Sequence, residues 1–257
     1  MKSLKFLINF YTKKIVFTKR EPSKIEKLKI SFLNCISHEI RTPVNAIVGF
    51  SRLLINNQLS ECNKKEYNKY IIDSAFSLLH KIDNIIDMSM ILSGQVKIQK
   101  CECKINEMLD NLVIKTNEKK IKLNKEDIKV ILIKPFQHNN DILIYTDQIW
   151  LTKILDNLLD NALKFTKKGF IKFGYFFVGQ KNSYLQFFVE DTGIGIPKNH
   201  QNNIFNRFVK IESRSELYGG LGLGLPISKN ITHLLGGKMW AISIVEKGSI
   251  FYFTLPV

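Results

Sequence analysis

The sequence predicts two consecutive domains. The first is a helical hairpin that pairs with a second copy into a four-helix bundle, and the second is an α+β domain in which helices cover one face of a mixed sheet. Apolar residues before Gly94 recur at alternating spacings of three and four, as in a bundle core. After Gly94, short apolar runs alternate with amphipathic stretches, which is typical of layered strands and helices. We therefore expect a basic segment over residues 1–21, the hairpin over 22–95 and the second domain over 96–257.

The first helix is expected over residues 22–56 and carries a histidine on its outer face. His38 lies two residues after a position of the apolar seam, a rotation of about 200°, so its ring points toward water. Thr42 is one turn further along the same face, and Glu39 flanks the imidazole. Taken alone, this pattern is more often an ordinary solvated helix face. The seam comprises Leu33, Ile36, Ile40, Pro43, Ile47, Phe50 and Leu54.

The second helix is expected over residues 62–93, where Ser93-Gly94 ends it. Two amphipathic helices of this length form a hairpin that cannot bury both apolar seams by itself. The sequence therefore predicts a homodimer, because two hairpins complete a four-helix bundle. The second seam comprises Ile71, Ala75, Leu78, Ile82, Ile85, Ser89 and Leu92.

The second domain is expected to mix strands and helices. Its clearest helix begins at Asp147 and ends near Lys167. The polar stretch 198–220 is long for a structureless loop, which favours a functional lid. The other expected elements are a strand at 96–100, a helix at 103–119, a strand at 128–133, a short apolar run at 142–145, strands at 170–178 and 184–190, a glycine-rich turn at 191–197, a helix at 222–235, and a closing hairpin of strands at 238–245 and 249–255.

The composition is that of an ordinary globular protein with a strong positive charge. The chain is 45% hydrophobic and 24% charged, and its net charge is +15. Nine Lys or Arg residues against two Glu residues lie in the first 30 positions, which fits either a segment beside an anionic membrane or a solvated tail. Binding to nucleic acid is suggested by the net charge alone and is not expected.

The chain shows no pattern for targeting or for crossing a membrane. No apolar run approaches the roughly 18 residues that span a bilayer, and the short apolar run near the start lacks a signal-peptide cleavage site. The four cysteines lack the spacing of a zinc site, so they are interpreted as reduced thiols. We therefore expect a cytoplasmic domain, either free or part of a membrane-bound parent protein.

Three polar side chains share one face of the helix that begins at Asp147. Asn157, Asn161 and Lys164 are spaced by four and then three residues. Amide oxygens suit Mg²⁺, and a lysine can meet a phosphate group as a point charge. Each residue alone fits an ordinary polar face, whereas the trio favours a site for magnesium and phosphate.

A glycine-rich turn runs from Asp191 to Pro197, directly after an expected strand. The Asp191 carboxylate can accept a hydrogen bond from an exocyclic amine. Gly193 and Gly195 allow the backbone to approach a flat ring or its phosphates closely. A tight turn is the simpler interpretation of this motif when it stands alone.

A second glycine-rich segment, Gly219–Leu225, opens a helix. Gly220, Gly222 and Gly224 alternate into the helix start, where free N–H groups and the helix dipole favour bound phosphate. A flexible hinge is the simpler interpretation. The Walker spacing is absent, which excludes a P-loop, and the motifs of the usual eukaryotic protein kinases are absent as well.

In their order along the chain, these motifs resemble those of the sensor histidine kinases of two-component systems. Each motif alone is weak to moderate, but five in the family's order are specific, and the resemblance covers about residues 25–257. The H, N, G1, F and G2 boxes of the family match Ser37–Pro43, Asn157–Lys164, Asp191–Pro197, Ile204–Phe208 and Gly220–Leu225.

The resemblance implies a dimerisation and phosphoacceptor hairpin followed by a Bergerat-type α/β sandwich that binds ATP with Mg²⁺. His38 matches the phosphorylated histidine, and Glu39 matches the residue that orients the ring or takes its proton. Thr42 matches the position that helps to place water when the kinase dephosphorylates its partner. The implied partner is the receiver domain of a response regulator, whose aspartate accepts the phosphoryl group.

The resemblance also implies the nucleotide-binding residues. The matched positions are Asn157 and Asn161 for Mg²⁺-phosphate, Lys164 for phosphate, Asp191 for the adenine amine with Gly193 and Gly195 beside it, Arg207 in the F box, and Gly220, Gly222 and Gly224 on the phosphate side.

Two residues depart from the family pattern. Leu221 stands where Thr or Ser is usual, which removes a hydroxyl contact, and Pro226 stands where a small residue such as Ala is usual. Leu221 keeps one alternative open, a catalytically degenerate scaffold that binds ATP and dimerises. Another Bergerat-fold ATPase, such as a chaperone or topoisomerase subunit, is disfavoured by the histidine-bearing hairpin.

Overall fold

The computed structural model describes residues 24–55, 59–135, 142–180, 183–207 and 221–257. The predictions for the basic segment 1–21, for Phe208 and for Gly220 lie outside these residues, as does most of the expected lid. The chain divides into two compact units, Met1–His38 and Glu39–Val257. In the first unit the described residues are the first half of a helix, and all other described elements belong to the second unit.

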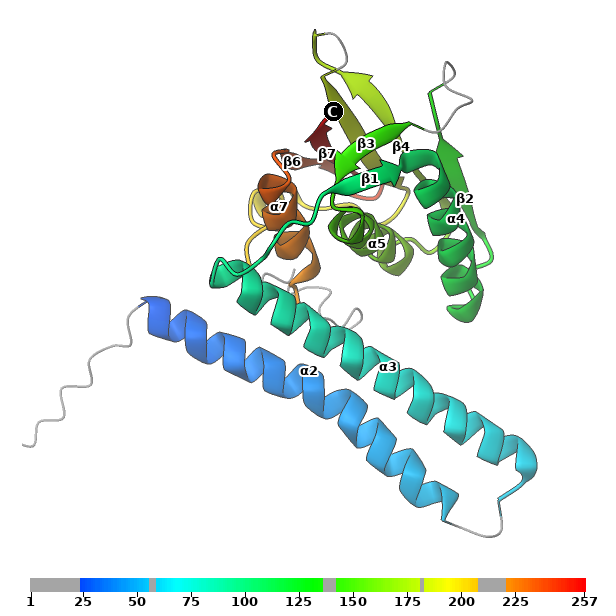
Figure 1. Ribbon diagram of the computed structural model, residues 1–257. Helices are drawn as coiled ribbons and strands as arrows, with labels where there is room; N and C mark the ends of the chain where they lie inside the picture. The colour runs from blue at the N-terminus through cyan, green and yellow to red at the C-terminus, as the bar shows by residue number, and fades with distance from the viewer. Residues whose placement is uncertain (1–23, 56–58, 136–141, 181–182, 208–220) are drawn as a thin grey trace, which may run out of the picture. The chain divides into compact units, whose positions relative to one another are not determined.

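The expected helical hairpin is present. Helix α2 (Lys24–Leu54) and helix α3 (Glu61–Leu92) match the predicted spans to within a few residues (Figure 1). The Ser60 side chain caps α3 by accepting a hydrogen bond from the Asn63 backbone at 3.2 Å. The helices contact each other where the Phe50 ring stacks on Tyr70, with 4.8 Å between ring centroids. Among the described helices, none is long and apolar enough to cross a membrane.

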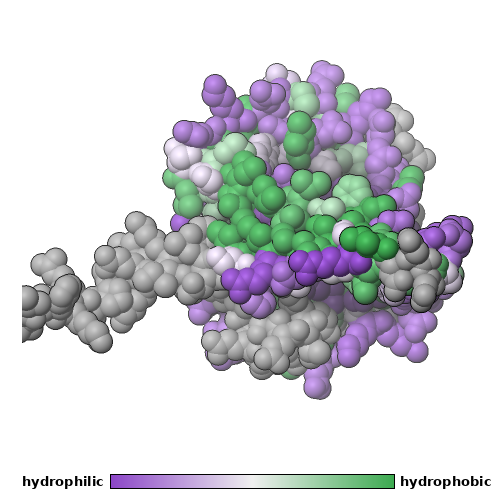
Figure 2. Space-filling model, turned by 90° about the horizontal axis from the view of Figure 1, so that it is seen from below, coloured by the Kyte–Doolittle hydropathy of each residue, from purple (hydrophilic) through white to green (hydrophobic). Residues whose placement is uncertain are grey.

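A stripe of exposed apolar side chains follows α3. Ile72, Phe76, Leu79 and Ile86 are each at least half exposed, and their spacing of four, three and seven places them on one helix face. The predicted seam next to this stripe, at Ile71 and nearby positions, is mostly half-buried. Figure 2, which shows the molecule from below relative to Figure 1, shows hydrophobic side chains gathered over a broad patch of surface. A single chain therefore leaves much apolar hairpin surface uncovered.

The second domain is built on a mixed sheet, as the sequence predicts, and the structure shows that this sheet has five strands. Its strand order is β2-β4-β5-β7-β6, with β2 parallel to β4 and all other neighbours antiparallel. Helices α4, α5 and α7 form a layer against one face of this sheet (Figure 1). The elements are α4 (Ile105–Lys122), β2 (Ile128–Ile133), α5 (Gln148–Phe165), β4 (Gly169–Val178), β5 (Tyr184–Asp191), α6 (Lys198–Gln201), α7 (Gly224–Leu234), β6 (Met239–Ile244) and β7 (Gly248–Pro256).

The core lies between the sheet and this helical layer. Tyr175, Phe187 and Phe253 sit side by side in register on β4, β5 and β7 and are fully buried. The Phe187 and Phe253 rings stack, with centroids 4.8 Å apart. Cross-strand aromatic pairs of this kind hold neighbouring strands together and give the helices an apolar surface to cover.

The strand expected at residues 96–100 is wrong. That segment has no regular structure, and β1 (Cys101–Lys104) follows it and pairs with β3 (Leu143–Thr146) in a separate two-stranded sheet. The backbone of Gln99 donates to the Asp147 carboxylate at 2.8 Å, so a side chain holds the extended segment. Alternating apolar residues indicate an extended chain, but they do not supply the neighbour that makes it a strand.

Candidate active site

Helix α5 presents the predicted trio from a firmly anchored position. The Asp147 side chain caps the helix by accepting hydrogen bonds from the backbone of residues 149 and 150. Asn157 is buried, and its amide donates to the Gly224 carbonyl at 3.4 Å and to the Ser228 hydroxyl at 3.2 Å. These bonds use the Asn157 amide nitrogen and tie α5 to the start of α7.

Asn161 and Lys164 lie one turn further along α5. Both are half-buried, and the Asn161 side chain makes no hydrogen bond to the part of the chain that the structure describes. The Lys164 ammonium lies over the Phe165 ring, 4.9 Å from its centroid. The structure thus brings the predicted trio onto one face of α5, and the binding of a ligand by Asn161 stays a prediction.

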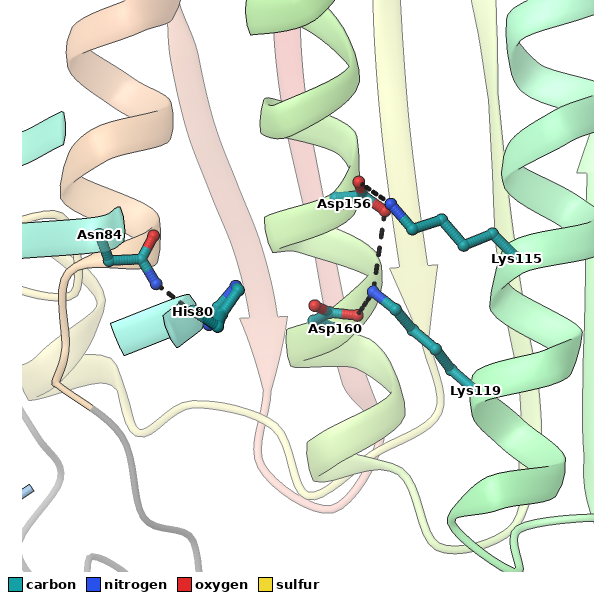
Figure 3. Close-up of polar contacts among 6 residues, drawn as sticks. All are labelled: His80, Asn84, Lys115, Lys119, Asp156 and Asp160. Atoms are coloured by element: carbon teal, nitrogen blue, oxygen red, sulfur yellow. Dashed lines mark hydrogen bonds and ion pairs between the residues drawn. The ribbon is translucent and has the colours of Figure 1, made fainter. Parts of the chain in front are cut away.

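The next positions around α5 carry charges that face α4. Asp156 and Asp160 each precede one of the asparagines, and they pair with Lys115 and Lys119 at 2.6 Å (Figure 3). Lys119 also approaches Asp156 at 3.8 Å. Each exposed pair contributes little alone. Two pairs one turn apart nevertheless favour a single rotation of α5 about its axis.

Lys125 holds the carboxyl end of α5. Its ammonium donates to backbone carbonyls of Leu163, Lys164 and Thr166, which the helix itself cannot satisfy. Burial, and then the nearby charge of Lys167, lowers the pKa of the Lys125 ammonium. This lysine was missed from the sequence, because the residues that it contacts lie about 40 positions away.

Asp191 lies buried at the end of β5. Its Oδ1 atom accepts a hydrogen bond from the Gly193 backbone at 2.8 Å. Burial raises the pKa of the Asp191 carboxyl to about 6, and the charge of Glu190 adds to the rise, whereas hydrogen bonds from the backbone of Gly193 and Ser249 oppose it. A buried carboxylate of this kind can accept a proton or a hydrogen bond from a ligand.

The glycines of the turn after β5 are needed for packing against the protein itself. A Cβ on Gly193 would lie 2.6 Å from the Phe165 carbonyl oxygen at the end of α5. Gly195 has a φ of +66°, and its Cβ would lie 2.1 Å from the Ile244 carbonyl oxygen. The turn is therefore fitted between α5 and β6. Whether these glycines also approach a ligand stays a prediction.

The start of α7 combines buried leucines with accessible glycine backbone. Leu221 and Leu223 are 5% and 1% exposed, whereas Gly222 and Gly224 are half-buried. No side chain caps the helix at Leu223, so its first N–H groups remain available to a ligand. Leu221 is thus a core residue, and Pro226 falls at the third helical position, where proline is tolerated.

The predicted phosphoacceptor face lies on α2. His38 and Thr42 are exposed, as the helix geometry predicts. Glu39 is only 7% exposed, and its carboxylate pairs with Lys81 of α3 at 3.0 Å. Lys81 was not identified from the sequence, because the spacing of residues along α2 says nothing about which lysine of α3 lies opposite.

The remaining predicted residues are only partly described. Arg207 is exposed, and the neighbouring Ile204 is buried. The Phe205 ring meets Phe251 edge-on, with centroids 6.5 Å apart, so the described part of the F box is anchored to β7.

These features define a class of protein. The second domain combines a mixed sheet, a glycine-rich helix start that no side chain caps, asparagine amides on α5 and a buried carboxylate, as in nucleotide-binding domains. It follows a hairpin with an exposed histidine. Residues 28–94 match the His Kinase A (phospho-acceptor) domain. Residues 146–257 match the family described as Histidine kinase-, DNA gyrase B-, and HSP90-like ATPase.

A sensor kinase that is similar in sequence to this chain agrees with these two family matches. The chain is 35% identical over 246 residues to the Autoinducer 2 sensor kinase/phosphatase LuxQ of Vibrio vulnificus. The aligned region covers 93% of this chain and 28% of LuxQ. The chain belongs to the sensor histidine kinases of two-component systems, and it spans less than a third of this relative.

Solved structures share the fold. The histidine kinase ThkA in complex with the response regulator protein TrrA is 24% identical, with a TM-score of 0.60 over 95% of this chain and 66% of that chain. Full-length ShkA in complex with AMPPNP is 24% identical, with a TM-score of 0.62 over 87% of this chain and 45% of that chain.

We predict that Gly195→Ala destabilises the protein more than Gly94→Ala. The two glycines have nearly equal positive φ angles, +66° and +65°, but a Cβ on Gly94 has nothing within 4 Å. Gly94→Ala should therefore cost only the left-handed backbone strain, about 1–2 kcal/mol. Gly195→Ala should add a packing penalty of about 1–3 kcal/mol. Urea unfolding of both variants checks this, and equal losses would contradict the close packing of the turn.

Proposed function

We propose that the chain is a histidine kinase core that autophosphorylates His38 from ATP and passes the phosphoryl group to an aspartate of a response regulator. One observation carries the proposal: Asn157 ties the start of α7, which no side chain caps, to α5, and Asn161 lies one turn further along α5. This arrangement would supply N–H donors, amide oxygens and a lysine for a polyphosphate, and His38, which matches the family's phosphoacceptor histidine, is exposed on α2.

Asp191 and the turn that follows it would bind the adenine. The buried Asp191 carboxylate accepts a hydrogen bond from the exocyclic amine, with Gly193 and Gly195 shaping the surrounding turn. The backbone of Gly222 and Gly224, with Lys164, faces the phosphates. ShkA, whose fold is similar, was solved in complex with AMPPNP, which is in keeping with this assignment.

Asn161, with the amide oxygen of Asn157, would hold Mg²⁺. Among the described residues there is no cluster of three or more His, Cys, Asp or Glu side chains that could hold a metal. Two amide oxygens suit an ion that keeps several waters and takes further ligands from phosphate. When bound, Mg²⁺ neutralises phosphate charge and aligns the γ-phosphoryl group.

The chemical step requires little beyond positioning and charge neutralisation. One nitrogen of the neutral His38 ring attacks the γ-phosphorus, an N–P bond forms, the bond to the bridging oxygen breaks, and ADP leaves. Glu39 takes the proton from the ring or orients it. In the reverse role, dephosphorylation of the partner, the exposed Thr42 hydroxyl would help to place water.

The proposed partner is the receiver domain of a response regulator. The similar ThkA was solved with the response regulator TrrA, and LuxQ is named a sensor kinase/phosphatase. Such a partner implies a cytoplasmic position for this chain. Proximity of the basic segment 1–21 to a membrane stays a prediction.

We predict that the chain forms a homodimer through the hairpin. The exposed stripe of Ile72, Phe76, Leu79 and Ile86 on α3 is the surface that a second hairpin would cover. Light scattering at micromolar concentration should give twice the monomer mass of 29.8 kDa. Phe76→Glu should shift the mass toward the monomer, whereas Tyr145→Glu, on the exposed face of β3, should not. A monomeric wild type would contradict this assembly.

We predict that ATP affinity falls as the pH is lowered through about 6. The pKa of Asp191 is raised to about 6, so the carboxylate is ionised above that pH and protonated below it. Protonation removes a charge-assisted hydrogen bond, so binding should weaken roughly three- to tenfold between pH 7.5 and pH 5. Calorimetry measures the affinity, and Asp191→Asn is the control for titration of ATP itself. If Asp191→Asn and wild type show the same pH dependence, Asp191 does not bind the adenine.

The decisive test uses γ-labelled ATP and Mg²⁺ with wild type, His38→Ala and Asn161→Ala. Wild type should acquire an acid-labile, alkali-stable label, His38→Ala should bind ATP but stay unlabelled, and Asn161→Ala should lose both binding and label, or nearly so. Label that persists in His38→Ala would overturn the assignment of the phosphoacceptor. ATP binding without any label in wild type would favour the scaffold alternative and make Leu221→Thr the next variant.

A further inference from the structure

A proline removes one hydrogen bond from the turn of α2 that carries the phosphoacceptor residues. In an α-helix, the N–H of each residue donates to the carbonyl four positions earlier. Pro43 lies inside α2 and has no N–H, so the Glu39 carbonyl cannot receive the usual helical bond. Both residues are buried, where water is a poor substitute for the missing donor. The turn therefore needs a donor from elsewhere in the protein.

Lys81 of α3 supplies this donor. Its Nζ atom lies 3.0 Å from the Glu39 carbonyl oxygen and 3.0 Å from Oε2 of the Glu39 carboxylate. The side chains of Lys81 and Glu39 are only 18% and 9% exposed. One partly desolvated ammonium thus holds both the backbone and the side chain of the residue that follows His38.

We propose that Lys81 is a positioning residue for phosphoryl transfer, because its ammonium replaces the hydrogen bond that Pro43 removes and holds the Glu39 carboxylate in place. This inference rests on the proposed roles of His38 and Glu39. Lys81 acts through Glu39: it fixes the backbone of the turn and the side chain assigned to orient the imidazole or take its proton.

The loss of the ammonium should affect the turn in two ways. The Glu39 carbonyl loses the donor that stands in for the helix, and the carboxylate loses a charge partner in a buried place, where an uncompensated charge is costly. Arginine keeps the charge and the donors, whereas methionine keeps only the length of the side chain. The two substitutions therefore separate the donor function of Lys81 from its packing.

The first experiment measures the initial rate of His38 labelling at saturating ATP in the full chain. Lys81→Met should lower the rate roughly ten- to a hundredfold, as expected when a reacting group is misplaced, with ATP affinity unchanged. Lys81→Arg should restore most of the rate. The matched control is Lys64→Met on the same helix, where the lysine pairs with Glu61 at 2.8 Å, and it should leave the rate unchanged.

Two outcomes would overturn the inference, and a third bears on the proposed function. Labelling of Lys81→Met at the wild-type rate, or no recovery in Lys81→Arg, would show that the ammonium does not position Glu39. A wild type that binds ATP but never becomes labelled would instead contradict the proposed kinase function. The two failures are therefore distinguishable.

The second experiment tests the backbone role without relying on activity. Pro43→Ala returns an N–H to position 43, so the Glu39 carbonyl regains its helical partner. Lys81→Met should therefore lower the unfolding temperature less in the Pro43→Ala background than in wild type. Equal losses in the two backgrounds would contradict the link between Lys81 and Pro43. If Lys81→Met alone fails to fold, recovery of folding in the double variant supports the inference, and failure to recover counts against it.

Discussion

The orientation of helix α5 is the constraint on which the candidate site depends. Leu151, Leu155 and Leu158 are fully buried, so packing against the rest of the domain selects one rotation of the helix. Ion pairs to α4 on one side and the Asn157 hydrogen bonds to α7 on the other favour the same rotation. Hydrophobic packing and polar contacts therefore favour the same orientation of α5, and the hydrogen bonds of Asn157 direct its amide toward the start of α7.

The candidate nucleotide site contains locally unfavourable features whose free-energy cost the rest of the domain must offset. A shift of the Asp191 pKa from 3.8 to about 6 corresponds to about 3 kcal/mol of unfavourable burial of the charged form at neutral pH. Gly195 adds a left-handed backbone conformation in contact with β6. Costs of this kind concentrate at functional sites. A fold selected for stability alone would contain neither a buried ionisable carboxyl nor a crowded left-handed backbone conformation.

In both domains, backbone carbonyls that a helix cannot satisfy lie next to a predicted site residue. In each domain they accept a hydrogen bond from a lysine that is distant in sequence. Pro43 interrupts the hydrogen bonds of α2, and Lys81 occupies the gap. The last turn of α5 leaves carbonyls exposed, and Lys125 satisfies them. In each case an ammonium on a flexible stem reaches backbone carbonyls that are about 40 residues away in the chain.

The sequence by itself determined most of the element types, the order of the motifs and therefore the family, because these depend on local periodicity, turn residues and spacing along one helix. It also predicted that His38 and Thr42 share an exposed face and that Asn157, Asn161 and Lys164 share another, since helix geometry alone sets both. Only the tertiary structure decided the contacts of Lys81, Lys125 and Ser228, the inward position of Leu221, and the pairing of β1 with β3. These contacts join segments far apart in sequence, and several lysines or strands could have met each one. Which partner does so is settled by the packing of the whole domain, which no local pattern records.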